Sequence, residues 1–199
     1  MIRYSWVLMV LCCHLSGPCC AQPNGNDSLF QSSALSAVRL SDAGTSRPVF
    51  LSSAPVIRLF IFLSPECPLC QNYTRPLNML KQQYGEKIQF WGIIPGKTYT
   101  REAILAFAEK YKISYPLLID SSLRLSRSLH AAVTPEVILL NARNELVYKG
   151  AIDNWLKELG KQRTKATENY LQDAIVMTLQ RKSPPVKRTR AVGCGINDF

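Results

Sequence analysis

Two cysteines three positions apart are the residues of this sequence best suited to chemistry. Cys67 and Cys70 lie in the stretch SPECPLCQ, after the apolar run of residues 55–63 and before a predicted helix. A pair at this spacing can bind a metal, form a structural disulfide, or act as a redox-active disulfide whose first sulfur is kept as a thiolate. The rest of the sequence has to decide among these three uses.

The position of the pair at the start of a helix favours redox chemistry. If the helix begins at Cys67, Pro68 takes the first helical position, where a missing N–H costs nothing, and Cys70 lies one turn later on the same face. The helix N-terminus then directs unpaired N–H groups at the Cys67 sulfur and lowers its pKa from about 8.5. We therefore expect Cys67 to be the nucleophile and Cys70 to resolve the mixed disulfide. Glu66 places a negative charge beside Cys67 and opposes thiolate formation.

The other uses of the pair fit less well. A structural zinc site needs four ligands, but beyond residue 21 the chain offers three cysteines and His130. A structural disulfide over so short a loop would stabilise the fold little. Copper(I) needs only two soft ligands, so a copper(I) carrier that uses Cys67 and Cys70 remains an alternative. A redox pair needs no metal and no cofactor beyond its own disulfide.

The N-terminus has the pattern of a signal peptide, which predicts export. Arg3 precedes a short apolar core, and small residues follow up to Ala21. We expect the protein in the periplasm or secreted, or held at a membrane by an uncleaved leader. The predicted organisation is a signal peptide at 1–21, a linker at 22–35, one domain at 36–181 and a basic, proline-containing tail at 182–199.

The charge of the chain says less about its partners. The formal net charge is +10, and about half of the excess lies in the C-terminal quarter. We interpret the basic run as a solvated face, with weak contact of the tail to anionic surfaces as the alternative. Nucleic acid is not an expected partner of an exported protein.

The hydrophobic pattern predicts a mixed α/β sheet with helices on both faces. The final helix has Thr167 as its candidate cap. The expected strands are a hairpin at 38–53, buried strands at 56–63 and 88–96, a short strand at 117–119 and a hairpin at 136–152. The expected helices are 67–84, 98–111, 122–129 and 167–180. The tail is expected to be extended or mobile.

SPECPLC at the end of a strand, a helix and a later VTPE before a hairpin resemble the thioredoxin superfamily, and its redoxin branch most of all. The resemblance covers about residues 36–181 and implies a thioredoxin-like fold with an extra strand and helix around 116–129. It implies thiol-disulfide exchange with protein substrates, and a membrane electron-donor protein as a partner. Cys67 would attack and Cys70 resolve, Pro135 would be a cis-proline beside the disulfide, and Thr134 would offer its backbone to the substrate.

Some residues depart from this pattern. Ile61 stands where thioredoxin has a buried acid, and Glu136 is a candidate replacement, although a surface strand glutamate is the simpler interpretation. Ser64 fits a peroxiredoxin-type peroxidase motif, but Phe60 replaces its proline, so peroxidase chemistry is the lesser enzymatic alternative. An inert redoxin scaffold used for interaction is a third possibility.

Cys194 lies in the tail, within VGCGI, which together with GAIDNW at 150–155 resembles features of extracytoplasmic redoxin-like proteins. It is either a third redox cysteine that reaches the Cys67–Cys70 site or a partner, or a tail thiol without catalytic work. Its neighbours Gly193 and Gly195 allow the backbone to approach another surface closely.

Overall fold

The computed structural model describes residues 38–51 and 54–196. The predicted signal peptide and linker lie outside these residues, as do positions 52–53 of the predicted hairpin and the last three residues of the tail. Among the described residues, no helix is both long enough and apolar enough to cross a membrane.

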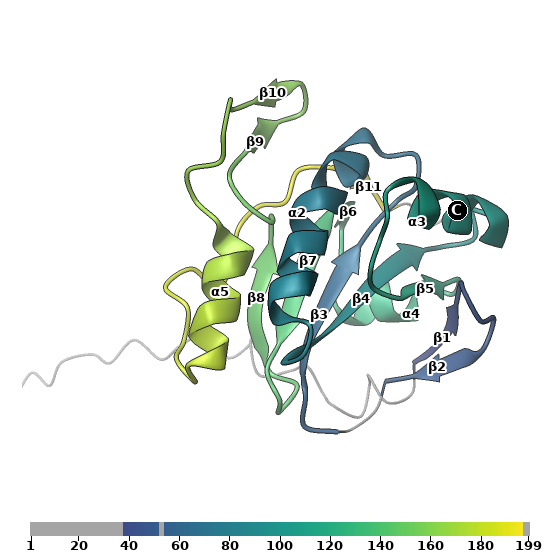
Figure 1. Cartoon of the computed structure of the whole chain (residues 1–199), viewed down its shortest axis with the longest axis horizontal. Helices are drawn as coiled ribbons and strands as arrows, with labels where there is room; N and C mark the ends of the chain where they lie inside the picture. Colours follow the sequence, from purple (N-terminus) through teal and green to yellow (C-terminus); the bar gives the residue numbers. More distant parts are fainter. Residues whose placement is uncertain (1–37, 52–53, 197–199) are drawn as a thin grey trace, which may run out of the picture.

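A seven-stranded mixed sheet forms the centre of the molecule (Figure 1). Its strands, in spatial order, are β2 (Pro48–Phe50), β1 (Arg39–Asp42), β5 (Leu117–Asp120), β4 (Ile88–Pro95), β3 (Ile57–Phe62), β7 (Glu136–Leu140) and β8 (Leu146–Gly150). The three strands β3, β4 and β5 are parallel to one another, and the outer strands pair antiparallel. The predicted mixed sheet is therefore confirmed.

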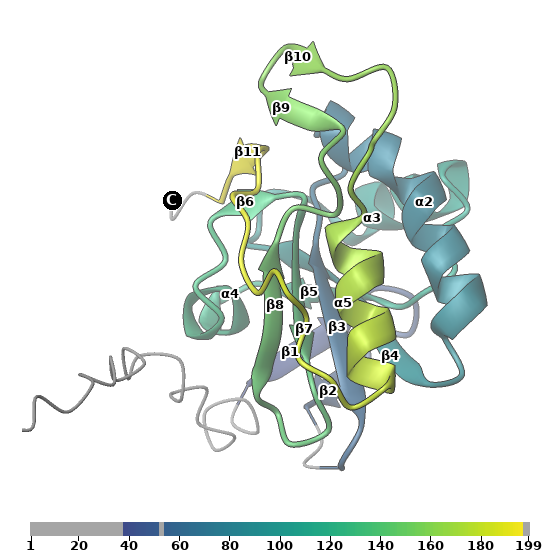
Figure 2. The same cartoon turned by 90° about the vertical axis from the view of Figure 1, so that its left-hand side faces the viewer.

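Helices cover both faces of this sheet. They are α2 (Pro68–Tyr84), α3 (Arg101–Lys110), α4 (Arg124–Ser128) and α5 (Tyr170–Leu179). Buried residues of α2, α3 and α5 share one core cluster, and Leu125 of α4 belongs to a second cluster. Figure 2 shows α4 on one side of the sheet and α2 with α5 on the other. The layers are those expected from the sequence.

Strand β3 is buried on both faces, and its alternation sets which side chains reach the cysteines. Leu59 and Ile61 pack into the cluster that contains Cys67 and Cys70, and Phe60 and Phe62 pack into the cluster of α4. A continuous apolar run is the pattern of such a doubly covered strand. The loop after β3 leads directly into α2, so the central strand positions the start of that helix.

Two short strand pairs and one helix start differ from the expectations. The hairpin of β9 (Leu156–Glu158) with β10 (Lys161–Gln162), and the pairing of β6 (Val133–Thr134) with β11 (Cys194–Gly195), were not predicted. The final helix begins at Tyr170, with Asn169 at its cap position, so the expected cap at Thr167 is wrong. The Thr167 hydroxyl instead accepts a hydrogen bond from Asn154.

Candidate active site

Cys67 occupies the cap position of α2, as the sequence predicts. Its backbone is extended (φ −75°, ψ 116°), and Pro68 follows at the first helical position. Cys67 is 2% exposed and Cys70, one turn later, is fully buried. Both cysteines are free thiols and belong to one core cluster. The helix therefore holds the two sulfurs together at the edge of the core.

The pKa values of the two thiols are shifted in opposite directions. The pKa of Cys67 is lowered to about 5, chiefly because the Cys70 thiol donates a hydrogen bond to it; burial opposes the shift, and a hydrogen bond from Cys194 assists it. Burial, and then the hydrogen bond and charge of Cys67, raise the pKa of Cys70. Glu66 is exposed, so water screens its charge, and the Cys67 pKa is low despite it. At neutral pH Cys67 is a thiolate and Cys70 keeps its proton.

The segment expected to bind substrate lies against Cys67. The Thr134–Pro135 peptide bond is cis, as expected for Pro135. The Cys67 Sγ lies 3.4 Å from the carbonyl oxygen of Thr134, in β6. The site thus combines a thiolate with the backbone of a short strand.

The third cysteine also lies at this site. The Cys194 thiol donates a hydrogen bond to the Cys67 Sγ, with 2.7 Å between the sulfurs. Strand β11 pairs antiparallel with β6, which sets Cys194 opposite Thr134. Both views show the tail segment beside β6, near the N-terminus of α2 (Figures 1 and 2). The tail is extended, and it follows β8 before it reaches Cys67.

Glu136 does not lie where a proton acceptor for the cysteines would be needed. Its backbone pairs with Phe62, whose side chain faces the cluster of α4 rather than the cysteines. Its carboxylate accepts a hydrogen bond from the Ala132 N–H at 2.8 Å, and lies 3.7 Å from the Lys149 ammonium. Glu136 is only 5% exposed. It is therefore a buried, paired residue of the opposite face, and the interpretation as a surface glutamate is wrong.

Tyr115 is the residue near Cys70 that the sequence did not indicate. Its buried hydroxyl has no hydrogen-bond partner among the residues that the structure describes. Burial, and then the charge of Cys70, raise the pKa of this hydroxyl. A Cβ on Gly92 would lie 2.4 Å from the Leu117 side chain and 3.1 Å from the Tyr115 ring, so this glycine makes room for both side chains. No sequence motif contains both Tyr115 and the cysteine pair, so their proximity appears only in the folded chain.

The GAIDNW segment fixes the first turns of α2. The Asp153 carboxylate accepts hydrogen bonds from the Tyr73 hydroxyl at 2.6 Å and from the Trp155 N–H at 2.8 Å. The rings of Tyr73 and Trp155 meet edge to face, with 5.8 Å between their centroids. This arrangement ties the helix that carries both cysteines to the loop after β8.

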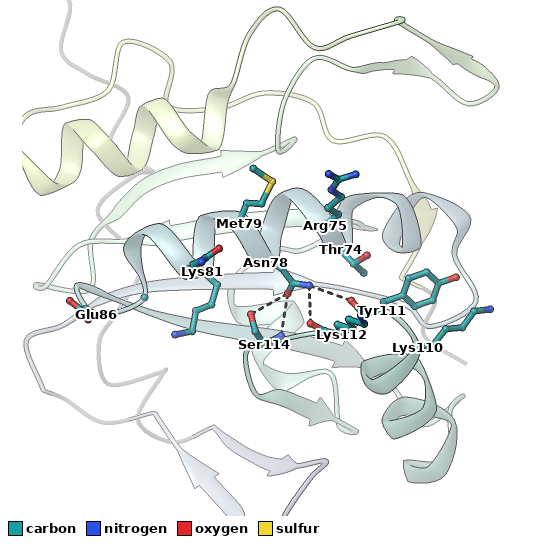
Figure 3. A pocket seen from close by; sticks show the side chains of 12 residues that line it. Thr74, Arg75, Asn78, Met79, Lys81, Glu86, Lys110, Tyr111, Lys112 and Ser114 are labelled. Carbon is teal, nitrogen blue, oxygen red and sulfur yellow. Dashed lines mark hydrogen bonds between the residues drawn. The ribbon is translucent and has the colours of Figure 1, made fainter.

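A hollow of about 820 Å³ lies elsewhere, between the C-terminal half of α2 and the turn after α3 (Figure 3). Its lining includes none of the cysteines. The Asn78 side chain crosses it to the backbone of Tyr111, Lys112 and Ser114. These hydrogen bonds join α2 to the turn after α3. Over residues 38–51 and 54–196 there is no group of three or more His, Cys, Asp or Glu arranged to hold a metal ion.

The comparisons with known proteins agree with this geometry. The Redoxin family model matches residues 27–162. No curated protein matches the chain. A hypothetical protein from Sinorhizobium meliloti is 25% identical with a TM-score of 0.70, over 79% of this chain and 88% of that one.

Two characterised structures have the same fold at lower identity. A secreted Mycobacterium tuberculosis disulfide oxidoreductase homologous to E. coli DsbE is 15% identical, with a TM-score of 0.54 over 75% of this chain and 98% of that one. StoA from Bacillus subtilis is 17% identical, with a TM-score of 0.50 over 58% of this chain and 88% of that one. The fold of this chain is therefore thioredoxin-like.

Proposed function

Because the chain belongs to the Redoxin family, we propose that it is an exported thiol-disulfide oxidoreductase that exchanges disulfides with protein substrates through Cys67 and Cys70. The observation that carries the proposal is the placement of the two thiols, with Cys67 at the cap position of α2 and Cys70 buried one turn later. Cys67, at the start of α2, has a pKa of about 5, and the pKa of its buried neighbour Cys70 is raised. An attacking thiolate beside a protected resolving thiol is what two-step exchange requires.

In the reducing direction, the Cys67 thiolate attacks one sulfur of a substrate disulfide. The substrate S–S bond breaks, a Cys67–substrate bond forms, and the other substrate sulfur leaves as a thiolate. Cys70 then loses its proton and attacks the Cys67 Sγ, so that the Cys67–Cys70 bond forms and the second substrate sulfur is released. Two electrons pass from the pair to the substrate. The two substrate thiolates take up two protons from water, one of which replaces the proton that Cys70 releases, because Cys67 starts as a thiolate. The reverse sequence oxidises a dithiol.

The resolving step becomes easier once the mixed disulfide has formed. Two of the influences that raise the pKa of Cys70 are the hydrogen bond to Cys67 and the charge of Cys67. Both disappear when the Cys67 sulfur is bonded to a substrate and carries no charge. Ile61 supplies no acid, so we infer that the Cys70 proton leaves to water that enters with the substrate.

The edge of β6 is the proposed binding site for an extended substrate segment. Thr134 places its carbonyl oxygen 3.4 Å from the Cys67 Sγ, so a peptide paired with β6 would present its sulfur to Cys67. If the pair acts as a reductant, a membrane protein that donates electrons is the partner that must re-reduce it. Export is supported by the signal-peptide pattern in residues 1–21 and by the likeness to a secreted protein.

The test is an exchange assay with glutathione and a disulfide-containing protein, on the full chain with the four cysteines of residues 1–21 and Cys194 replaced by Ser. Cys67→Ser should abolish exchange, and Cys70→Ser should accumulate a mixed disulfide at Cys67. Full exchange activity in Cys67→Ser would refute the proposal. Anaerobic copper(I) titration of the reduced protein tests the alternative. Tight stoichiometric copper(I) binding that is lost in Cys70→Ser would favour a copper(I) carrier over an oxidoreductase.

A further inference from the structure

We propose that Cys194 is a third redox residue: its sulfur forms a disulfide with Cys67, in exchange with the Cys67–Cys70 disulfide, while the tail occupies the substrate's place on β6. The inference rests on the proposed exchange chemistry at Cys67. Three independent features support it, namely the approach of the sulfurs, the strand pairing around them and the anchoring of the tail on β8.

The sulfurs of Cys194 and Cys67 lie close enough to react with each other. The Cys194 thiol hydrogen-bonds to the Cys67 Sγ across 2.7 Å, and a disulfide requires about 2.05 Å. A shift of under an ångström would therefore join them. Cys67 is only 2% exposed with the tail in this position. A substrate sulfur must displace Cys194 before it can reach Cys67.

The backbone around Cys194 binds β6 as an added strand would. Cys194 pairs with Thr134, and the N–H of Ile196 donates to the carbonyl oxygen of Ala132 at 2.9 Å. A Cβ on Gly193 would lie 2.2 Å from the Thr134 carbonyl oxygen, so at this position only glycine lets the tail approach. Strand addition beside a reactive sulfur is also how an extended peptide substrate would bind.

The tail reaches this position because β8 holds it a few residues earlier. The Thr189 N–H donates to the Lys149 carbonyl oxygen at 3.0 Å, and the Thr189 hydroxyl accepts from the Ala151 N–H at 2.9 Å. The hydroxyls of Thr189 and Tyr148 are also hydrogen-bonded, at 2.6 Å. So short a tether between Thr189 and Cys194 gives the Cys194 sulfur a high effective concentration at Cys67.

The exchange needs no outside oxidant. In the oxidised protein, the Cys194 thiolate attacks the Cys67 Sγ of the Cys67–Cys70 disulfide. The Cys67–Cys194 bond forms, the Cys67–Cys70 bond breaks, and Cys70 takes up the proton that Cys194 released. No electrons leave the chain. The product shields the Cys67 sulfur from substrates and leaves Cys70 as a buried thiol.

Disulfide mapping tests the inference. The full chain with the four cysteines of residues 1–21 changed to Ser is equilibrated with glutathione buffers, quenched in acid and digested without reduction for mass spectrometry. We expect both Cys67–Cys70 and Cys67–Cys194 peptides, and only Cys67–Cys194 in Cys70→Ser. Absence of the Cys67–Cys194 peptide from the protein that retains Cys70, or a Cys70→Ser protein with glutathione on Cys67 and a free Cys194, would overturn the inference.

A glycine variant separates docking from chance collision of the thiols. In the Cys70→Ser protein, Gly193→Ala should lower the ratio of Cys67–Cys194 to glutathionylated Cys67 roughly tenfold, because the added Cβ expels the tail from β6. Gly44→Ala is the matched control, since its Cβ would meet only the Asp42 side chain at 3.3 Å. An unchanged ratio in Gly193→Ala would contradict the strand-docked arrangement.

The variant Cys194→Ser distinguishes this inference from the proposed function. If it exchanges with glutathione through Cys67 and Cys70, and the protein that retains Cys194 forms no Cys67–Cys194 bond, only the third-cysteine inference fails. If Cys194→Ser does not exchange at all, the proposed function itself fails.

Discussion

Cys67 is stabilised as a thiolate by the two other thiols at the site. Cys70 makes the larger contribution and Cys194 a smaller one, and both do so by donating hydrogen bonds to the Cys67 sulfur. Burial, and then the hydrogen bond to Cys67 and the charge of Cys67, raise the pKa of Cys194 itself to about 11. The reactivity of one sulfur therefore depends on two residues that are distant from each other in the sequence.

Removing the Cys194 donor should raise the pKa of Cys67 above about 5. We predict this increase for Cys194→Ala in the reduced protein, measured by thiolate absorbance at 240 nm against pH. Cys194→Ser is the control, because its hydroxyl can still donate and should raise the pKa less. Identical titration curves for Cys194→Ala and the protein that retains Cys194 would show that the contact does not stabilise the thiolate.

Tyr115 gives a stability prediction at the same scale. Its buried hydroxyl lacks a partner among the described residues, so Tyr115→Phe removes an unsatisfied group and keeps the ring. The free energy of unfolding in urea should stay equal or rise by about 1 kcal/mol. A loss of more than about 1 kcal/mol would show that the hydroxyl has a partner in solution.

The position of Cys67 and Cys70 at the start of a helix could be predicted because local spacing defines it. The cis bond at Pro135 was expected from the family resemblance, and the structure brings Thr134 and Cys194 to the same sulfur. Glu136 shows where such reasoning stops. Which face of β7 its side chain occupies depends on register with β3, and a single sequence does not reveal register.

At the scale of elements, side-chain hydrogen bonds hold both halves of α2, in addition to its packing against the sheet. Asp153 binds Tyr73 near the cysteines, and Asn78 bridges the other half of the helix to the turn after α3. Asn78 uses both ends of its amide: it donates to the Lys112 carbonyl oxygen at 2.9 Å and accepts from the Ser114 N–H at 3.1 Å.

Asn78→Ala should therefore lower the free energy of unfolding by about 1–2 kcal/mol, because several backbone groups lose their partners. Met79→Ala is the matched control on the same helix, since Met79 is 61% exposed and should change stability by less than about 0.5 kcal/mol. The reduction potential of the cysteine pair should not change in either variant. Equal stabilities of the two variants in urea would contradict the role of Asn78 as a joint.

Long elements could be predicted from the sequence, and the two-residue strands could not. The run at 56–63 and the three-and-four spacing after Cys67 correspond to β3 and α2 within one or two residues. Strands as short as β6 and β11 have no periodicity to detect, since each exists only through its partner. The docking of the tail depends on such a pair, so it became visible only in the folded chain.

For the whole molecule, the low pKa of Cys67 links stability to pH. The pKa of Cys67 falls from about 8.5 in the unfolded chain to about 5 in the folded protein. This shift stabilises the reduced protein, and the full contribution is present at pH values above the unfolded pKa. This contribution is lost as the pH falls through the window towards about 5. The oxidised protein has no such thiolate and lacks the effect.

The free energy of unfolding of the reduced protein should thus rise relative to that of the oxidised protein between pH 5 and 8. Urea unfolding of both forms at matched pH measures the difference, and groups that titrate alike in both forms cancel. Cys67→Ser with its remaining cysteines reduced is the control. Its free energy of unfolding should not rise relative to that of the oxidised protein over this pH range, because it has no Cys67 thiolate. A difference that is flat over this pH range would mean that the Cys67 thiol is not acidic in solution.

The reduction potential of the Cys67–Cys70 pair is the most direct test of the central claim. It should be measured against glutathione in the full chain with Cys194 and the four cysteines of residues 1–21 replaced by Ser. A stabilised thiolate makes a pair more oxidising, so we predict a value above thioredoxin's ~−270 mV and below ~−120 mV. A pair that never equilibrates with glutathione, yet is reduced after unfolding, would contradict the claim and leave an inert scaffold.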